Sequence, residues 1–156
     1  MVISTVPVFH EGNTQASDEE VDQIVLLANQ LIGRIFTAKD GQDRIIGWDD
    51  ILFVAPYNHQ VNKLRLALGD QAKVGSVDKF QGQEAPIVFL SICASNANDS
   101  ARGVNFLFDK NRINVAVSRA QCMAIVVYSP VLLETSASNV EQLGLVNLFC
   151  RLINQR

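Results

Sequence analysis

The stretch that decides the fold reads Val74-Gly75-Ser76-Val77-Asp78-Lys79-Phe80-Gln81-Gly82-Gln83-Glu84. It joins a short segment with strand character, Lys73 to Val77, to a continuous apolar run, Pro86 to Cys93. A continuous apolar run of this length is typical of a strand buried on both faces of a parallel sheet. Gly75 and Gly82 permit close backbone approach. The stretch is therefore interpreted as a tight connection, dense in small and polar groups, between two strands.

Strand-like and helix-like segments alternate along the rest of the chain. Further strands are predicted at Val2 to Val8, Ile51 to Ala55 and Met123 to Ser129. Helical spacing is present in residues 21–31, Gln60 to Leu68, Asn111 to Ala120 and Val140 to Ile153. Repeated strand–helix units with short turns predict an α/β fold with a mostly parallel sheet and helices on both faces.

The segment boundaries follow from local signals. Ser17 and Glu20 form a capping box before the first helix, and Gly33 is a plausible end for it. Asp40-Gly41 is a turn signal, so residues 34–50 are expected to form a loop or a short hairpin. Residues 94–105 are expected to form a polar loop.

Composition limits the class of protein. Of the 156 residues, 48% are hydrophobic and 19% charged, which favours one domain with a packed core. The net charge of −3 argues against a protein that coats DNA through a broad basic surface, but it permits local contacts to a strand. No apolar run reaches the roughly 20 residues that a membrane-spanning helix needs, and the first residues lack a basic segment before an apolar stretch, so no secretory signal is expected. The three scattered cysteines fit neither a disulfide framework nor a zinc site, so a cytoplasmic protein without a membrane partner is expected.

Ligands of parallel α/β sheets bind beyond the carboxyl ends of the strands. Three segments are predicted there: Ala55 to Gln60, Ser76 to Glu84, and the helix from Asn111. In the second segment, Ser76 and Gln81 offer neutral donors suited to phosphate oxygens, and Glu84 offers an acceptor suited to a ribose hydroxyl. The alternative is a tight connection whose polar residues are only solvated.

Two arginines mark the third segment. Arg112 and Arg119 are seven residues apart and would share one face of a helix. A firmly held arginine can stabilise a transferring phosphoryl group; the alternative is two surface arginines that pair with carboxylates at the end of the sheet. In the first segment, Tyr57 and Asn58 could hold a base or a strand backbone, and the alternative there is a simple proline-initiated helix start.

Several chemistries lack their residues. No glycine is followed by lysine, so the phosphate-binding loop G-x-x-x-x-G-K-[ST] is absent from this sequence. No buried strand ends in the paired acids that hold magnesium. Neither His10 nor His59 has a second ligand at metal spacing, so both are interpreted as ordinary polar residues and no metal site is expected. The chain is therefore not expected to hold ATP by itself.

At these residues the chain resembles the C-terminal motor domain of superfamily 1B helicases, the group that contains the nonsense-mediated-decay helicase. Val54 to Gln60 is similar to helicase motif IV, Gly75 to Glu84 with the apolar run after it to motif V, and Asn111 to Ala120 to motif VI. The order and spacing of the motifs match over residues 1–135. The wording of residues 77–86, 106–112 and 7–13 most resembles bacterial proteins that join such a helicase to a RecB-like nuclease.

The resemblance implies a role for each matching residue. Arg119 corresponds to the motif VI arginine that reaches the γ-phosphate across the domain cleft, which makes it the implied catalytic residue. Glu84 corresponds to the motif V acid at the nucleotide ribose, and Gly82 and Gln83 would line the same ATP cleft. Arg112 would couple motif VI to motif V. The residues implied to face the nucleic-acid backbone are Tyr57, Asn58, Ser76, Lys79 and Gln81.

The implied fold is RecA-like, as in P-loop NTPases, without the phosphate-binding loop. Motifs I, II and III and the Gln-x-Arg segment that usually precedes this domain are missing, so residues 1–156 are expected to be a single second motor domain excised from a larger protein. An upstream RecA-like domain of that parent would hold most of the ATP and Mg²⁺. Single-stranded DNA or RNA and possible attachment to a RecB-like nuclease domain complete the implied partners of this ATP-dependent helicase.

Two other functions fit the pattern. The first is a RecA-like module that grips nucleic acid or a protein without an ATP cycle. The second is an unrelated doubly wound domain that binds a small metabolite or acts as a receiver. Such a domain would bind a small ligand alone, whereas half of a motor would bind nucleotide only weakly.

Overall fold

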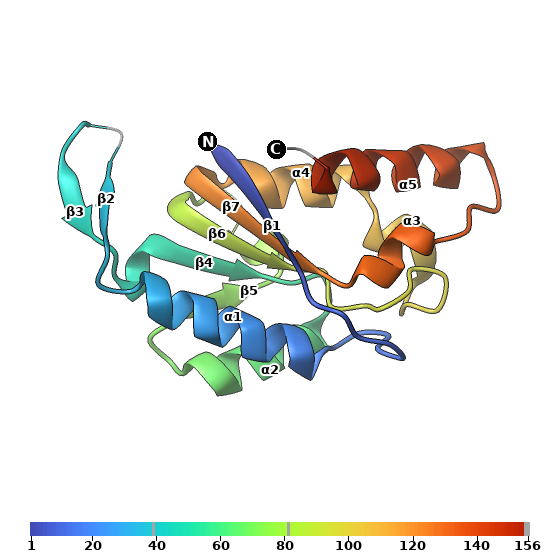
Figure 1. Ribbon diagram of the computed structural model, residues 1–156, viewed down its shortest axis with the longest axis horizontal. Helices are drawn as coiled ribbons and strands as arrows, with labels where there is room; N and C mark the ends of the chain where they lie inside the picture. The colour runs from blue at the N-terminus through green and yellow to red at the C-terminus, as the bar shows by residue number, and fades with distance from the viewer. Residues whose placement is uncertain (39, 81, 155–156) are drawn as a thin grey trace.

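The computed structural model describes residues 1–38, 40–80 and 82–154. Within these residues, five strands form one sheet in the order β1-β7-β6-β4-β5, and each neighbouring pair is parallel. Figure 1 shows the strands running side by side with a common direction. This arrangement confirms the predicted α/β, RecA-like fold. The strands are β1 (Val2–Pro7), β4 (Ile51–Val54), β5 (Lys73–Gly75), β6 (Ala85–Ser91) and β7 (Ala120–Tyr128).

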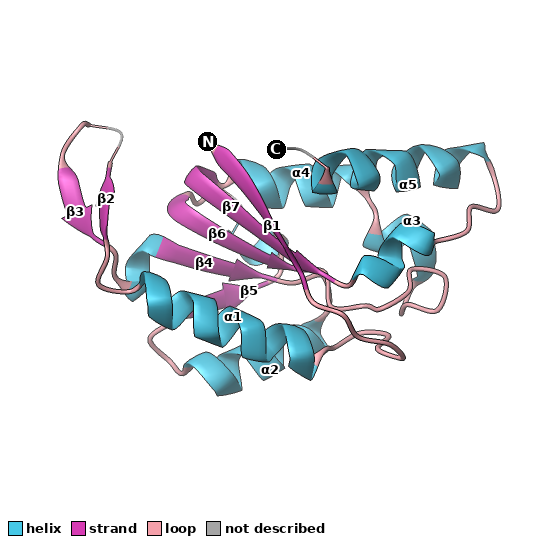
Figure 2. Ribbon diagram, in the orientation of Figure 1, coloured by secondary structure: helices cyan, strands magenta, loops and turns pink. Residues whose placement is uncertain are grey.

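Helices cover both faces of the sheet (Figure 2). One face carries α1 (Asp18–Leu31) and α2 (Asn58–Leu68). The other carries α3 (Gly103–Leu107), α4 (Lys110–Ser118) and α5 (Val140–Ile153). The short hairpin predicted as one possibility for residues 34–50 is present as β2 (Ile35–Thr37) and β3 (Asp43–Ile45). Single turns of 3₁₀-helix complete the chain at η1 (Trp48–Asp50), η2 (Asp78–Phe80) and η3 (Pro130–Glu134).

The central strands are buried on both faces, which explains their uninterrupted apolar sequences. Successive side chains of a strand point to opposite faces, so Ile51 and Phe53 pack with α1 and α2, whereas Leu52 and Val54 pack on the side of α4 and α5. Phe53 stacks on Phe89 of β6 with ring centroids 5.2 Å apart. The result is two cores separated by one sheet.

The start of α1 has half of the predicted capping box. The Ser17 hydroxyl accepts a hydrogen bond from the Glu20 amide at 3.1 Å, as expected of a cap. Glu20 does not return to the Ser17 amide, because that amide donates to Gln60 Oε1 at 2.8 Å. The Glu20 carboxylate is instead buried in a network described below. The helix ends at Leu31, and Gly33 follows with φ of 89°, which confirms it as a helix stop.

Two boundaries differ from the sequence predictions. Strand β5 ends at Gly75 rather than Val77, because the carbonyls of Ser76 and Val77 already accept turn hydrogen bonds from the next residues of η2. The segment predicted as a polar loop ends inside α3, where Val104 is buried. A helix of five residues is too short to produce a visible helical period, which explains why it was missed.

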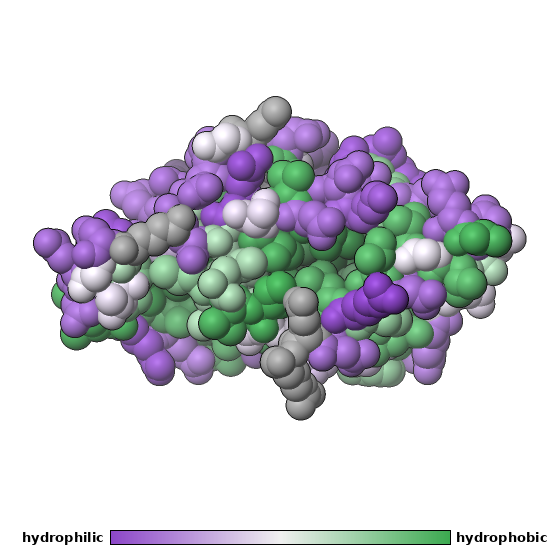
Figure 3. Space-filling model, turned by 90° about the horizontal axis from the view of Figure 1, so that it is seen from above, coloured by the Kyte–Doolittle hydropathy of each residue, from purple (hydrophilic) through white to green (hydrophobic). Residues whose placement is uncertain are grey.

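Among the described helices, none combines the length and apolar character that crossing a membrane requires. Figure 3 looks onto the α4–α5 side and shows hydrophobic residues gathered in the middle of this face, with polar residues around them. The two helices therefore leave part of the apolar surface of this side uncovered.

Candidate functional site

The connection between β5 and β6 carries most of the predicted site residues. In the strand register, Gly75 of β5 is paired with Val54 of β4, and Val54 is paired with Leu90 of β6. Strand β6 begins at Ala85, five residues before Leu90. At about 3.3 Å per strand residue, residues 76–84 therefore carry the chain back along the strand direction by roughly 17 Å. The connection thus starts at the carboxyl edge of the sheet and ends at its amino edge.

This course corrects one expectation. Tyr57, Asn58 and Ser76 do lie at the carboxyl edge, directly after β4 and β5. Glu84 and Arg119 instead lie immediately before β6 and β7, at the amino edge. The prediction that all three segments gather at the carboxyl ends was wrong, because every connection in a parallel sheet starts at the carboxyl edge and ends at the amino edge, where the residues directly before β6 and β7 lie.

The carboxyl-edge residues line a groove of about 450 Å³. Asn58 is exposed at the first residue of α2, and Ser76 is half-buried. Tyr57 is buried, and its hydroxyl donates a hydrogen bond to the Ala101 carbonyl. Burial raises the pKa of the Tyr57 hydroxyl above its ordinary value. The ring of Tyr57 therefore forms part of the groove wall, and it is not free to stack on a base.

Lys79 folds back on its own connection. Its ammonium donates to the Val74 carbonyl at 2.9 Å. A Cβ added to Gly75 would lie 2.4 Å from Lys79 Cδ, so only glycine leaves room for the lysine stem. The predicted strand contact of Lys79 would have to use the remaining donors of this tethered ammonium. Gln81, the other predicted contact in this segment, lies outside the described residues.

The amino-edge residues gather around the start of β6. The Ala85 amide donates to the Arg119 carbonyl at 3.0 Å, which fixes the end of α4 against the crossover. Glu84 is exposed and accepts a long hydrogen bond of 3.4 Å from Gln121. Gly82 has φ of 79°, a conformation that favours glycine, and Gln83 beside it is exposed. Gly82, Gln83 and Glu84 thus precede the residue whose amide is bonded to the backbone of Arg119, and their role at a nucleotide stays a prediction.

Helix α4 connects the two edges. It starts beside the carboxyl-edge groove and ends at Arg119, and a second groove of about 240 Å³ lies along it between Val77 and Asp78 on one side and Arg112, Val115 and Arg119 on the other. Arg112 also lines the first groove. This position fits the predicted role of Arg112 in coupling motif VI to motif V.

Neither Arg112 nor Arg119 forms an ion pair with another residue that the structure describes. No carboxylate lies within 4.0 Å of Arg112 or Arg119 among the residues that the structure describes. The Nε of Arg119 is buried and has no hydrogen-bond partner in the same set of residues. The alternative of two arginines paired with carboxylates at the end of the sheet is therefore wrong.

Sequence reasoning missed two residues of the carboxyl-edge groove. Arg102 and Phe106 both line it, and the Arg102 guanidinium carbon lies 3.9 Å from the Phe106 ring centroid. No local pattern marks this pair, because Arg102 precedes α3 as its N-cap with φ of 65° and only Phe106 lies in the helix.

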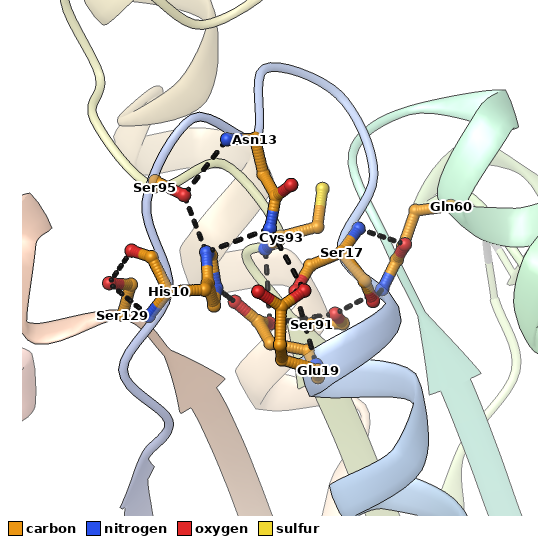
Figure 4. A network of polar contacts seen from close by, with 10 residues as sticks. His10, Asn13, Ser17, Glu19, Gln60, Ser91, Cys93, Ser95 and Ser129 are labelled. Atoms are coloured by element: carbon orange, nitrogen blue, oxygen red, sulfur yellow. Dashed lines mark hydrogen bonds and ion pairs between the residues drawn. The ribbon is translucent and has the colours of Figure 1, made fainter.

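A buried polar network lies behind this groove (Figure 4). His10 Nε2 lies 2.6 Å from Glu20 Oε2, and both side chains are fully buried. Glu20 Oε1 accepts hydrogen bonds from the Ser91 hydroxyl at 2.8 Å and the Cys93 amide at 3.1 Å. Burial raises the pKa of the Glu20 carboxyl, and the hydrogen bond from His10 opposes this shift. His10, interpreted from the sequence as an ordinary polar residue, is a buried one that takes part in this network.

The network holds the wall of the groove. It fixes the segment after β1, whose Asn13 and Thr14 carbonyls accept hydrogen bonds from the amides of Ser95 and Ala101, both at 2.9 Å. The carbonyl of Ala101 also accepts the hydrogen bond from the Tyr57 hydroxyl. The groove is thus built from three segments that are far apart in sequence. Within the described part of the chain, no group of three or more His, Cys, Asp or Glu side chains is arranged to hold a metal ion.

Comparisons with known proteins show what this chain is similar to. A family described as "AAA domain" matches residues 7–130. "Putative helicase mov-10-B.1" of Danio rerio is 34% identical over 131 residues, which cover 74% of this chain and 13% of that protein. "RNA helicase Mov10l1" of Homo sapiens is 38% identical over 88 residues, 52% of this chain and 7% of the relative.

A yeast relative extends the range of the similarity. "DNA polymerase alpha-associated DNA helicase A" of Schizosaccharomyces pombe is 44% identical over 73 residues, 45% of this chain and 11% of that protein. In each of these relatives the matched region is a small part of the whole. The family match spans most of the chain, including the grooves, Arg112 and Arg119, so the chain belongs to this AAA domain family and is a relative of superfamily 1 helicases.

Proposed function

We propose that residues 1–156 form the second motor domain of an ATP-dependent superfamily 1 helicase. The observation that carries the proposal is the environment of Arg119. Backbone hydrogen bonds to α4 and β6 fix its position, yet its guanidinium has no ion pair and its buried Nε no partner among the described residues. An arginine held in this way is preorganised to meet a charge that arrives from another domain.

Arg119 is proposed as the arginine finger. A planar guanidinium with several donors suits the equatorial oxygens of a transferring phosphoryl group. Arginine fingers of other phosphoryl-transfer enzymes contribute about 10³–10⁵ in rate. ATP bound with Mg²⁺ supplies the phosphoryl group whose transfer to water releases the energy for movement. An upstream RecA-like domain of the parent protein is proposed to hold most of both.

Three neighbours of Arg119 complete the proposed nucleotide contact. Glu84 is exposed and only weakly engaged, so its carboxylate is available as an acceptor for ribose hydroxyls. Gly82 and Gln83 are exposed beside it and would line the cleft. The residues of this chain bind and orient one side of the nucleotide, and the cation is held by the partner domain.

The carboxyl-edge groove is proposed to hold single-stranded DNA or RNA. Asn58 and Ser76 offer neutral donors there, and Gln81 is proposed to add another. Lys79 is proposed to add a charged donor from its tethered position, and Tyr57 to shape the wall. Arg112 lies in both grooves, so it is proposed to couple strand contact to nucleotide contact. Attachment of a RecB-like nuclease to the parent is also proposed, on the wording of the motifs alone.

The test is ATPase turnover of the full-length parent with and without a single-stranded oligonucleotide. We expect strand-stimulated turnover that falls by about 10³-fold or more in Arg119→Ala. Arg119→Lys keeps the charge but loses the planar fork, so we expect it to be impaired as well. Arg44→Ala is the matched control, because Arg44 is exposed on the distant β2–β3 hairpin.

Two results would contradict the proposal. ATPase turnover of Arg119→Ala close to that of the wild type would show that Arg119 is not the arginine finger. Strand binding without stimulated turnover would favour a RecA-like binding module that has no ATP cycle.

A further inference from the structure

Strand β7 contains a β-bulge close to its start. Ala85 of β6 is paired with Ala120, and the next register pair joins Ile87 to Met123, so β7 has one residue more than β6 over this interval. Bulges are rare between parallel strands, and they recur next to active sites, where they re-aim a side chain. Gln121 lies inside this bulge, and its side chain is therefore freed from the regular alternation of the strand.

The side chain of Gln121 contacts the proposed ribose acceptor. Its Nε2 donates to Glu84 Oε2 at 3.4 Å, and this is the single side-chain hydrogen bond of either residue within the part of the chain that the structure describes. Gln121 is half-buried, whereas Glu84 is exposed. Hydrogen bonds in the ligand-free sites of enzymes are often long and shorten when the ligand binds. The distance therefore fits a contact that a nucleotide completes.

The backbone keeps the two side chains in this relation. The Ala85 amide donates to the Arg119 carbonyl at 3.0 Å, so the residue after Glu84 is bonded to the residue two before Gln121. Glu84 and Gln121 thus lie on either side of one contact between the two chain segments. The same contact fixes the backbone of Arg119, so the three side chains keep a common frame.

We infer that Gln121 is a positioning residue that orients the Glu84 carboxylate toward a ribose hydroxyl. The inference rests on the proposed function and adds a residue to its nucleotide contact. An exposed glutamate loses side-chain entropy when it is ordered by a ligand. The amide of Gln121 holds Oε2 beforehand and leaves Oε1 to accept from the ribose. Because the amide is neutral, it leaves the carboxylate charge that strengthens a hydrogen bond from a hydroxyl.

The test compares ATP with 2′,3′-dideoxy-ATP, which lacks both ribose hydroxyls, in the strand-stimulated ATPase of the full-length parent. Gln121→Met keeps the length of the side chain and removes the donor. We expect it to raise KM for ATP about fivefold with little change in kcat. The ribose lies away from the reacting phosphoryl group, so loss of its contact weakens ground state and transition state alike. KM for the dideoxy nucleotide should stay the same, because no hydroxyl is present for Glu84 to accept.

Substitution of Glu84 shows whether Gln121 acts through it. We expect Glu84→Ala to raise KM for ATP about tenfold and to remove the discrimination between the two nucleotides. Adding Gln121→Met to Glu84→Ala should then have no further effect on KM. Gln121→Glu keeps the shape but places a second carboxylate beside the first, so it should raise KM for ATP at least as far as Gln121→Met does.

Gln71→Met is the matched control. Gln71 also donates a surface hydrogen bond, to the Leu68 carbonyl at 3.1 Å, but it lies before β5 at the far edge of the sheet. It should leave KM for both nucleotides unchanged. Calorimetric Kd values for the same nucleotides give the same comparison without turnover, so the inference is tested even where Arg119 proves not to be the finger.

Three outcomes would overturn the inference. An unchanged affinity for ATP in Gln121→Met, beside a loss of discrimination in Glu84→Ala, would show that Glu84 needs no orienting group, and it would leave the proposed function intact. Equal losses of affinity for ATP and for the dideoxy nucleotide would show that Gln121 serves the fold of the site. Discrimination that survives Glu84→Ala would reject the ribose contact of the proposed function, and the role of Gln121 with it.

Discussion

The buried pair of His10 and Glu20 gives the sharpest test of how this fold is held together. Replacing Glu20 by alanine leaves three buried groups without their acceptor: the Ser91 hydroxyl, the Cys93 amide and the His10 imidazole. A buried polar group without a partner costs about 1–3 kcal/mol. We therefore expect Glu20→Ala to lower the free energy of unfolding by about 3–6 kcal/mol, since some of the groups will find other partners.

The companion substitution Glu20→Gln keeps the test valid even where the alanine variant fails to fold. Small domains have unfolding free energies of about 5–15 kcal/mol, so Glu20→Ala leaves little in reserve. Glutamine keeps an amide oxygen that can accept from both Ser91 and Cys93. We expect Glu20→Gln to cost about 1 kcal/mol, because only the contact with His10 has to rearrange.

Urea unfolding followed by fluorescence measures these differences directly. Trp48 is the single tryptophan of the chain, and its ring lies 6.3 Å from that of Phe53 in the core, so its emission reports loss of that packing. With a slope of about 1–3 kcal/mol per molar urea, a loss of about 4 kcal/mol lowers the midpoint by about 2 M. A midpoint for Glu20→Ala close to that of Glu20→Gln would refute the reasoning, because it would show that the three groups do not depend on the carboxylate.

The same pair predicts a pH dependence with a definite sign. Burial raises the pKa of the folded-state Glu20 carboxyl above its ordinary value of 4.5. The folded state therefore holds this proton more tightly than the unfolded state does. The stabilisation from this proton is complete below pH 4.5 and is lost as pH rises through the higher folded-state pKa. We expect the stability of the wild type relative to Glu20→Gln to fall over that window, and a rise would contradict the assigned shift.

Two further predictions concern the segments that shape the site. Gly75→Ala should displace Lys79 and lower the free energy of unfolding by about 1–2 kcal/mol, as overpacking does. Its cost should shrink when Lys79→Ala is added, since the clash is with that side chain; equal costs in both backgrounds would place the strain elsewhere. Tyr57→Phe should cost about 1 kcal/mol in urea unfolding, because the Ala101 carbonyl loses its donor. A neutral result would mean that water replaces the hydroxyl there.

The strands and long helices could be predicted from sequence because their signals are local. Residues 51–54 and 85–91 are buried on both faces, and their apolar runs record that burial directly. The helix at Val140–Ile153 was predicted with the bounds that the structure has. Its buried apolar residues join the core on one side of the sheet, where Phe149 contacts Phe108 and Tyr128, and Asn139 caps its start.

The site was only partly predictable, because its arrangement depends on contacts between distant segments. The motifs identified Arg112, Arg119 and Ser76, but they did not show that Ser76 and Arg119 lie at opposite edges of the sheet. That separation follows from the parallel sheet, because Ser76 directly follows β5 and Arg119 directly precedes β7. The His10–Glu20 pair was missed because its burial depends on contacts with Ser91 and Cys93, which are distant in sequence. A histidine before a helix and a glutamate in its first turn are ordinary surface residues unless the fold buries both.

Helix α4 gives the two edges a physical connection. Its nine residues span about 13 Å, at about 1.5 Å per residue, and they carry Arg112 near one end and lead to Arg119 at the other. A helix this short has no internal hinge, and Ile113, Ala116 and Val117 anchor it in the core. Arg119 directly follows α4 as its C-cap, so a rigid movement of α4 toward a nucleotide also moves Arg112, which lies against Phe106 in the groove. The proposed contacts with the strand and with the nucleotide are therefore coupled through one short helix and its C-cap.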